Sequence, residues 1–248
     1  MVASVCARGG VGLNYKREGQ LSILVVPQAI FENRQDAGRQ LAVKLSEYSD
    51  QSAVVLAIPN GGVPVALEVA DALNADVDLV ICRKIPIPLN PEAGFGAIAG
   101  DGTIFLNEEI VEEIGLSRQQ IEYEANKVRD EIKQRSILYR GDRPLVRVSG
   151  RTIILIDDGL ASGITMMAAV ESVRRRRTKE IVVAVPCASA MAVKQLEGVA
   201  DEVVVVTVGD VPRFAVADFY RHWCDIRNDE VTQYLRQWRL RHFRQNQS

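Results

Sequence analysis

The segment from Ile153 to Thr165 constrains the fold of this 248-residue chain more than any other part of it. It begins with four branched apolar residues, 153–156, a pattern typical of a strand buried on both faces of a sheet. Two adjacent carboxylates, Asp157 and Asp158, follow, and after a short loop an apolar-periodic stretch over 164–173 predicts a helix. Because ligands of open α/β sheets bind where strands end and helices begin, we expect a functional site in this segment.

The polar groups of the segment suit the two ends of a sugar phosphate. Ionised Asp157 and Asp158 only accept hydrogen bonds, and a ribose 2′,3′-diol offers two adjacent O–H donors. The loop has the opposite character, because its backbone N–H groups, two hydroxyls and helix N-terminus form a nest for a phosphate dianion. It consists of Ala161, Ser162, Gly163, Ile164 and Thr165. The alternative interpretation is an ordinary strand end at which an aspartate caps a helix.

The two neighbouring carboxylates also require a partner. At an effective dielectric constant of about 20, two charges in contact repel each other by ~4 kcal/mol. We therefore expect a cationic or donor-rich group beside Asp157 and Asp158. A sugar diol, with any Mg²⁺ that sits on it, would serve.

This segment resembles the phosphoribosyl-pyrophosphate (PRPP) signature of the type I phosphoribosyltransferases: an apolar strand, two acidic residues and a small-residue loop ending in Thr-Gly-x-Thr. Ser162 stands where the family usually has the first Thr, and it keeps the hydroxyl. The resemblance extends from roughly Phe31 to Asp229. It implies transfer of the 5-phosphoribosyl group of PRPP to a nitrogen acceptor, typically a nucleobase, with release of pyrophosphate. It also implies Mg²⁺ carried mainly by PRPP, near Asp157 and Asp158, with no dedicated metal ligands on the protein.

Helical and strand patterns alternate along the chain, which predicts an α/β fold with an open, mainly parallel five-stranded sheet and helices on both faces. The expected strands are Ala53–Ile58, Val77–Cys82, Thr152–Ile156, Ile181–Val185 and Val203–Val208. The expected helices are Asn33–Tyr48, Val63–Leu73, Ser117–Tyr139, Ile164–Val173, Ala190–Leu196 and Asn228–Phe243. We divide the chain into a loose N-terminal extension (1–20), a phosphoribosyltransferase-like domain (21–227) and a C-terminal helix and tail (228–248).

A second candidate loop follows the strand Ala53–Ile58. Asn60, Gly61 and Gly62 directly precede a predicted helix, and glycines let the backbone approach an anion closely. In the family this loop holds the pyrophosphate of PRPP. Related sequences most often carry a basic residue at the position of Asn60, so in this chain the contacts would fall on backbone N–H groups. A tight strand–helix turn without a ligand is the alternative.

A third candidate is the pair Arg83 and Lys84, which follows the predicted strand Val77–Cys82. It resembles the strand end of purine-type phosphoribosyltransferases, where basic residues contact pyrophosphate and a mobile loop follows. Guanidinium and ammonium groups can neutralise a leaving pyrophosphate, although such side chains also extend along sheet edges without any ligand. The next segment, 86–107, is rich in proline and glycine. We predict a lid loop there, or else a surface loop with a short β-hairpin.

Composition narrows the range of partners. The net charge is −2 and the isoelectric point about 5.8, so no global field attracts nucleic acid or an acidic membrane. No apolar stretch reaches the ~18 residues of a membrane span. Four scattered cysteines without a C-x-x-C pair predict free thiols in a reducing compartment, and hence a cytoplasmic protein. We expect PRPP and a nucleobase as partners, no nucleic acid or membrane, and a homodimer as a further possibility.

Three classes of function remain open from the sequence. Phosphoribosyl transfer gives a role to all three candidate segments. A catalytically weak or inactive protein of the same fold that senses PRPP or a nucleotide is the alternative, favoured by the unusual Asn60. A dinucleotide-dependent oxidoreductase would need G-x-G-x-x-G after its opening strand, which this chain lacks. A phospho-receiver domain would carry its acidic pair near the first strand, whereas here the pair follows a central one.

Overall fold

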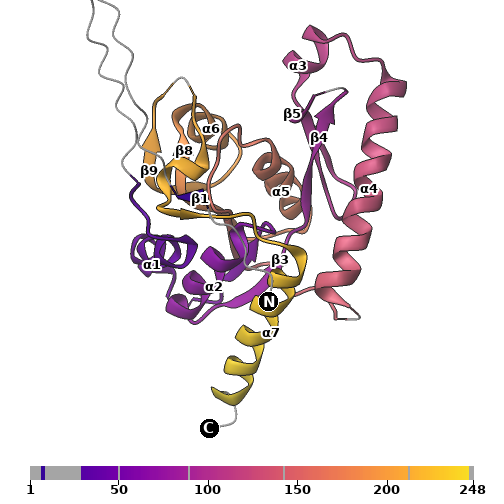
Figure 1. Cartoon of the computed structure of the whole chain (residues 1–248). Coiled ribbons are helices and arrows are strands. Elements are labelled where there is room, and N and C mark those ends of the chain that lie inside the picture. Colours follow the sequence, from indigo (N-terminus) through magenta and orange to yellow (C-terminus); the bar gives the residue numbers. More distant parts are fainter. Residues whose placement is uncertain are drawn as a thin grey trace, which may run out of the picture.

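The computed structural model describes residues 7–8, 29–49, 51–88, 90–141, 143–211 and 213–245. A five-stranded sheet in the order β3-β2-β7-β8-β9 forms its centre (Figure 1). Its strands are β2 (Val54–Ala57), β3 (Asp76–Leu79), β7 (Thr152–Ile156), β8 (Glu180–Ser189) and β9 (Glu202–Gly209). Every pairing in this sheet is parallel, which confirms the predicted fold class.

Helices cover both faces of this sheet, and the alternation of side chains along β7 shows how. Ile154 and Ile156 point into a core shared with α1 (Arg34–Lys44) and α2 (Gly62–Leu73). Ile153 and Leu155 point into a second core, on the opposite face. That second core is shared with α5 (Ile164–Arg174) and α6 (Ala190–Leu196). Burial on both faces explains why the strand is an unbroken apolar run.

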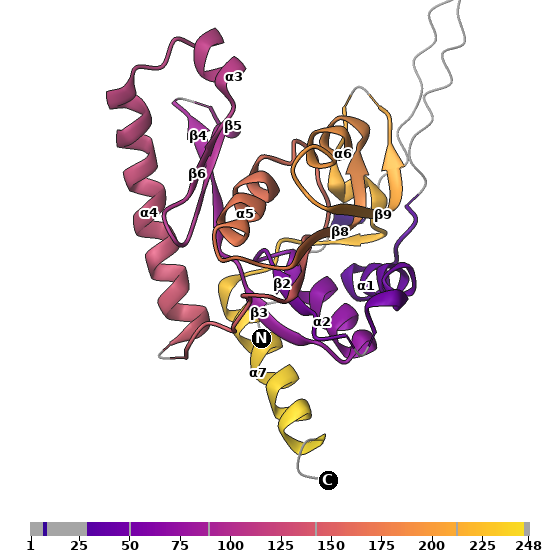
Figure 2. The same ribbon diagram turned by 180° about the vertical axis from the view of Figure 1, so that it is seen from behind.

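A second, antiparallel sheet stands beside the first in the order β4-β5-β6 (Figure 2). Its strands are β4 (Cys82–Ile87), β5 (Asn90–Ala99) and β6 (Ile104–Leu106). Two helices follow them, α3 (Glu108–Glu113) and the long α4 (Arg118–Arg140). A capping box forms at the start of α4, where Ser117 and Gln120 bond each other's backbone N–H groups. We call β4–β6 with α3 and α4 the hood, and the parallel sheet with the helices on its two faces the body.

The hood settles the structure of the segment 86–107 and corrects one expected strand. Most of the segment lies in β5 and β6, whose antiparallel pairing is the β-hairpin that we expected as the alternative to a lid loop. Its glycines reflect close packing: a Cβ on Gly96 would lie 2.5 Å from the carbonyl oxygen of Phe105 on the paired strand. The predicted strand Val77–Cys82 is divided, since β3 ends at Leu79 and β4 begins at Cys82. Arg83 and Lys84 therefore belong to the hood.

The last helix, α7 (Asn228–Gln245), docks its start on the body and then leads away from it (Figure 1). Val231 and Leu235 are buried in the core beneath α2. Three short elements complete the description: η1 (Ser46–Tyr48), η2 (Val216–Phe219), and the two-residue pair of β1 (Ala7–Arg8) with β10 (His222–Trp223). Apart from β1, the predicted extension 1–20 lies outside the described residues. Among the described helices, none is both long and apolar enough to cross a bilayer.

Candidate functional site

The acidic pair and the second candidate loop meet at the carboxyl edge of the parallel sheet. Neighbouring strands β2 and β7 end side by side, with Ala57 paired to Ile156. A Cβ on Gly61 would lie 2.0 Å from Oδ2 of Asp158, and one on Gly62 would lie 2.6 Å from the carbonyl oxygen of Ile156. Only glycine fits at these two positions. The fold therefore brings together two of the three candidate segments.

Asp157 differs from Asp158 in its electrostatic surroundings. Burial raises the pKa of its carboxyl group well above the usual range, and the nearby charge of Asp158 raises this pKa further. Its Oδ1 accepts the backbone N–H of Asp158 at 2.8 Å. Asp157 also lines a cavity at the sheet edge, so its carboxyl group faces the space where a ligand could bind. A cation or hydroxyl donor in that space would favour its ionised form.

Asp158 has a different partner, Arg34 at the start of α1. The Nε of Arg34 lies 2.8 Å from Oδ2 of Asp158, and both side chains are largely buried. The guanidinium also donates to the carbonyl oxygen of Cys224 at 2.8 Å and lies 3.9 Å from the ring centroid of Trp223. The hydroxyl of Tyr220 donates to the carbonyl oxygen of Asp158 at 2.6 Å. Arg34 thus supplies a cation beside the acidic pair. The repulsion between the two neighbouring carboxylates had led us to expect such a group.

The sequence contains no signal that identifies Arg34 itself. It lies 124 positions from Asp158 and matches no motif of the family. It is, however, one of few charged residues buried in the described structure, with a relative exposure of 6%. Burial of a guanidinium requires a matched acceptor, so such a residue is a candidate for a structural ion pair.

Alanine at Gly61 is expected to destabilise the protein by about 1 to 3 kcal/mol, because the added carbon overlaps the carboxylate that Arg34 holds in place. Urea denaturation of Gly61→Ala measures this. Gly198→Ala is the matched control, since its Cβ would lie 3.5 Å from the nearest atom, an ordinary contact. Equal stability of the two variants would contradict the observed approach of loop and carboxylate.

The predicted phosphate loop lines a cavity of about 230 Å³. Within the described residues, the backbone N–H groups from Ala161 to Thr165 have no hydrogen-bond acceptor. The loop is held through its carbonyl groups instead: Ser189 donates from its N–H to Leu160 and from its hydroxyl to Ala161. Unsatisfied N–H groups at the start of a helix are a favourable site for an anion. The loop therefore has the donor arrangement that a phosphate group needs.

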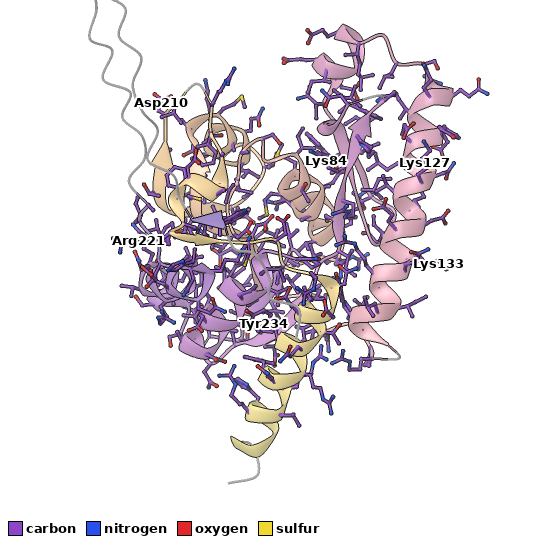
Figure 3. The ribbon with its side chains drawn as sticks, viewed as in Figure 1. Lys84, Lys127, Lys133, Asp210, Arg221 and Tyr234 are labelled. Carbon is purple, nitrogen blue, oxygen red and sulfur yellow. The ribbon has the colours of Figure 1, made fainter. Side chains whose placement is uncertain are left out.

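Lys84 and Arg83 lie on opposite faces of β4, as neighbouring residues of a strand must. Lys84 lines the same cavity as Asp157 and the phosphate loop, and Figure 3 labels it on the side of the hood that faces the body. Its stem crosses β5 at Gly94, where a Cβ would lie 2.2 Å from Cγ of the lysine. Arg83 faces α4 instead and pairs with Glu131 at 3.4 Å. The two predicted cations are thus not brought to one place.

The side chain of Asn60 lies outside the cavity lining and joins the loop to two helices. Its Oδ1 accepts hydrogen bonds at 2.8 Å from Arg135 and from the hydroxyl of Tyr139, both on α4. Its Nδ2 donates to Oδ1 of Asn228 at 3.1 Å, at the start of α7. The peptide bond before Asn60 is cis. In the described part of the chain the backbone N–H groups of Asn60 and Gly61 have no acceptor, so they remain the donors that this loop offers.

Comparison with known proteins agrees with this architecture. The family model described as "Phosphoribosyl transferase domain" matches residues 106–217, which contain the acidic pair and the phosphate loop. Two proteins from strains of Mycobacterium tuberculosis, each named "Putative phosphoribosyl transferase", are 38% identical over 206 residues, which is 83% of this chain and 46% of theirs. The crystal structure of TT1426 from Thermus thermophilus is 36% identical with a TM-score of 0.70, covering 84% of this chain and 98% of that one.

The chain therefore belongs to the phosphoribosyl transferase family. It spans about half the length of the curated relatives it matches. The similarity to TT1426 extends over nearly all of that protein, so the two chains share the fold of body and hood.

Proposed function

We propose that this protein binds PRPP and transfers its 5-phosphoribosyl group to a nitrogen acceptor, with release of pyrophosphate. One observation carries the proposal: unsatisfied N–H groups of the loop 161–165 and the buried carboxyl group of Asp157 line the same cavity. A ribose 5-phosphate presents an anion and a pair of hydroxyl donors, so it complements both.

Each part of the site has a proposed role. Ala161, Ser162, Gly163, Ile164 and Thr165 bind the 5-phosphate. Asp157 accepts hydrogen bonds from the ribose diol, and Asp158, held by Arg34, maintains the shape of the strand end. The backbone N–H groups of Asn60 and Gly61 and the ammonium group of Lys84 bind the pyrophosphate, whereas the N–H of Gly62 already donates to the carbonyl oxygen of Ile58.

Magnesium fits this site only with help from the substrate. No group of three or more histidine, cysteine, aspartate or glutamate side chains in the described residues could hold a metal ion alone. The carboxyl group of Asp157, which lines the cavity, nevertheless suits a hard cation with oxygen ligands, whereas Asp158 already pairs with Arg34. Asp157 would hold Mg²⁺ together with oxygens of PRPP, and the metal would neutralise charge on the pyrophosphate.

Charge explains how these residues would promote the reaction. Loss of pyrophosphate from C1 of the ribose leaves positive charge on the sugar and adds negative charge to the leaving group. The carboxylate of Asp157 would face the positive charge on the sugar, while Lys84 and the loop N–H groups would face the negative charge on the pyrophosphate. Such fixed charges and dipoles need no reorganisation during the reaction, and they favour the transition state over bound PRPP. The hood would cover the site and exclude water.

A sensor of PRPP or a nucleotide is the second candidate. It is favoured by Asn60, whose side chain serves to connect helices, and by Arg83, which pairs with Glu131 on the opposite face of the hood. Both arrangements leave less positive charge beside a leaving pyrophosphate. A sensor would bind PRPP tightly and release no pyrophosphate.

The test is an assay of pyrophosphate release from PRPP with a panel of nucleobases, with and without Mg²⁺. Mg²⁺-dependent release with one base class supports the transferase. Thermal stabilisation by PRPP without release under any of these conditions supports the sensor. No stabilisation and no release would contradict both, because each requires PRPP to bind.

Alanine at Lys84 is expected to slow turnover by roughly 10- to 100-fold, on the scale of about 1.5 to 3 kcal/mol for a hydrogen bond to a charged group. Thermal melting should change little, because the side chain lies at a cavity. Lys127→Ala is the matched control on α4, where the ammonium group pairs with Glu124 and lies over the ring of Tyr123 at the surface (Figure 3). Equal rates for the two variants would exclude a role for Lys84 in leaving-group stabilisation.

The remaining assignments are proposals of the same kind. A nucleobase is the acceptor that family membership favours. A reducing, cytoplasmic setting is favoured by Cys82, Cys187 and Cys224, which are free thiols. A homodimer is proposed only from its frequency in the family.

A further inference from the structure

A second cavity, of about 250 Å³, lies between the edge strand β3, the end of α4 and the middle of α7. It shares no lining residue with the candidate site. Its apolar floor comes from β3 and the residues after it, and its walls are an aromatic ring of α7 and several guanidinium groups. We call it the arginine cavity. Its polar and aromatic lining comprises Asp78, Tyr139, Arg140, Arg143, Trp238 and Arg239.

Positive charge dominates the arginine cavity. Three guanidinium groups, those of Arg140, Arg143 and Arg239, line it, while Asp78 is the only carboxylate among its lining residues. That carboxylate is already engaged, because its Oδ2 accepts from Arg140 at 2.8 Å and from the backbone N–H of Val146 at 2.9 Å. One negative charge therefore faces at least three positive charges.

Hydrogen bonds to carbonyl groups hold two of these guanidinium groups in place. Arg143 donates from Nε to the carbonyl oxygen of Arg140 at 2.9 Å and from Nη2 to that of Tyr139 at 2.7 Å. Arg140 donates from Nη2 to the carbonyl oxygen of Leu79 at 3.2 Å. Carbonyl groups orient a guanidinium but carry no net charge, so they leave the charge of Arg143 available, whereas Arg140 also pairs with Asp78.

The electrostatic environment agrees with this geometry. Burial lowers the pKa of Arg143, and the neighbouring charge of Arg140 lowers it further. Burial also lowers the pKa of Arg176, which bonds the carbonyl oxygen of Val146 beside the cavity. An anion bound beside Arg143 would offset the repulsion between Arg143 and Arg140.

We propose that the arginine cavity is a binding site for a phosphate-class polyanion, either free pyrophosphate or the phosphate groups of a nucleotide. Guanidinium groups match phosphate oxygens in pairs, and several of them held in advance lose little freedom on binding. The indole ring of Trp238 forms one wall of the cavity, where a nucleotide base could pack.

Tyr139 connects this cavity to the loop 60–62. Tyr139 is among the residues that line the arginine cavity, and its hydroxyl donates to Asn60 at 2.8 Å and lies 2.6 Å from Oδ1 of Asn228. An anion bound beside Arg143 would thus lie one side chain away from Asn60. If the proposed function holds, occupancy of the cavity has a direct route to the pyrophosphate loop.

The two tryptophans provide the test, because Trp238 lines the arginine cavity and Trp223 stacks on Arg34 beside the candidate site. In protein labelled with ¹⁵N-tryptophan, each indole N–H resonance is assigned with a Trp→Phe variant. Titration with pyrophosphate, without Mg²⁺, is expected to move the Trp238 resonance to saturation. A parallel titration with ADP distinguishes the sources: tighter binding of ADP indicates a nucleotide, and equal binding indicates recognition of the phosphates alone.

The double variant Arg143→Gln/Arg239→Gln is expected to weaken this binding at least 10-fold. Arg236→Gln, on the same helix but outside the cavity lining, should bind as the parent does. Arg239→Gln alone keeps the contacts of Arg143 with the end of α4 and serves if the double variant does not fold. The proposal is wrong if the Trp238 resonance does not saturate, if the double variant responds like the parent, or if sodium chloride at equal ionic strength reproduces the shift. Movement of the Trp223 resonance reports separately on binding at the candidate site. The proposal for the arginine cavity and the proposed function can therefore be refuted independently.

Discussion

Replacement of Arg34 by alanine is expected to lower the free energy of unfolding by about 3 to 5 kcal/mol, because it leaves the carboxylate of Asp158 buried without a counter-charge. The guanidinium also stacks on Trp223 and bonds the carbonyl oxygen of Cys224, so three contacts disappear together. Denaturation by urea near pH 7 measures the loss.

Two variants separate this ion pair from a general effect of truncation. Arg39→Ala removes an exposed arginine of the same helix and should change stability by no more than about 0.5 kcal/mol. The double variant Arg34→Ala/Asp158→Asn removes both charges and should recover part of the loss, since no unpaired carboxylate remains. Equal stability of the single and double variants would show that the charge of Asp158 is not what Arg34 compensates.

Replacement of Asp157 by asparagine is expected to weaken binding of PRPP with Mg²⁺ by roughly 30- to 100-fold, a loss of about 2 to 3 kcal/mol for hydrogen bonds to a charged acceptor. Stability should move the other way. The buried carboxylate is disfavoured by burial and by Asp158, and the asparagine oxygen can still accept the N–H of Asp158. Calorimetric titration and thermal melting on the same samples measure both changes. Unchanged affinity for PRPP would remove Asp157 from the ribose site.

The raised pKa of Asp157 adds a dependence on pH. The folded protein holds this proton more tightly than the unfolded chain, whose aspartates titrate near about 3.9. The contribution of Asp157 to stability therefore falls as pH rises from that value towards its raised folded pKa. Affinity for PRPP should rise over the upper part of the same range, because the diol requires the ionised acceptor. The Asp157→Asn variant should show neither this fall in stability nor this rise in PRPP affinity with pH.

Local patterns in the sequence predicted much of the body of the fold. The apolar run ending at Ile156 lies in a strand buried on both faces, and Ser117 caps the helix that was expected to begin there. The segment 86–107 left two structures open, a lid loop and a β-hairpin. Its glycines and prolines indicate irregular structure when read one by one, whereas Gly94 and Gly96 exist so that paired elements can approach closely.

Sequence alone determined the order of the elements, the position of Asp157 at the end of a central strand, and the donor-rich loop that follows it. These features depend on backbone hydrogen bonding and on the period of apolar residues, both of which act over a few positions. Only the tertiary structure decided that Arg34 neutralises Asp158, that Arg83 and Lys84 face opposite ways, and that the amide of Asn60 joins two helices. Each of these outcomes depends on contacts between distant parts of the chain, which local spacing does not record.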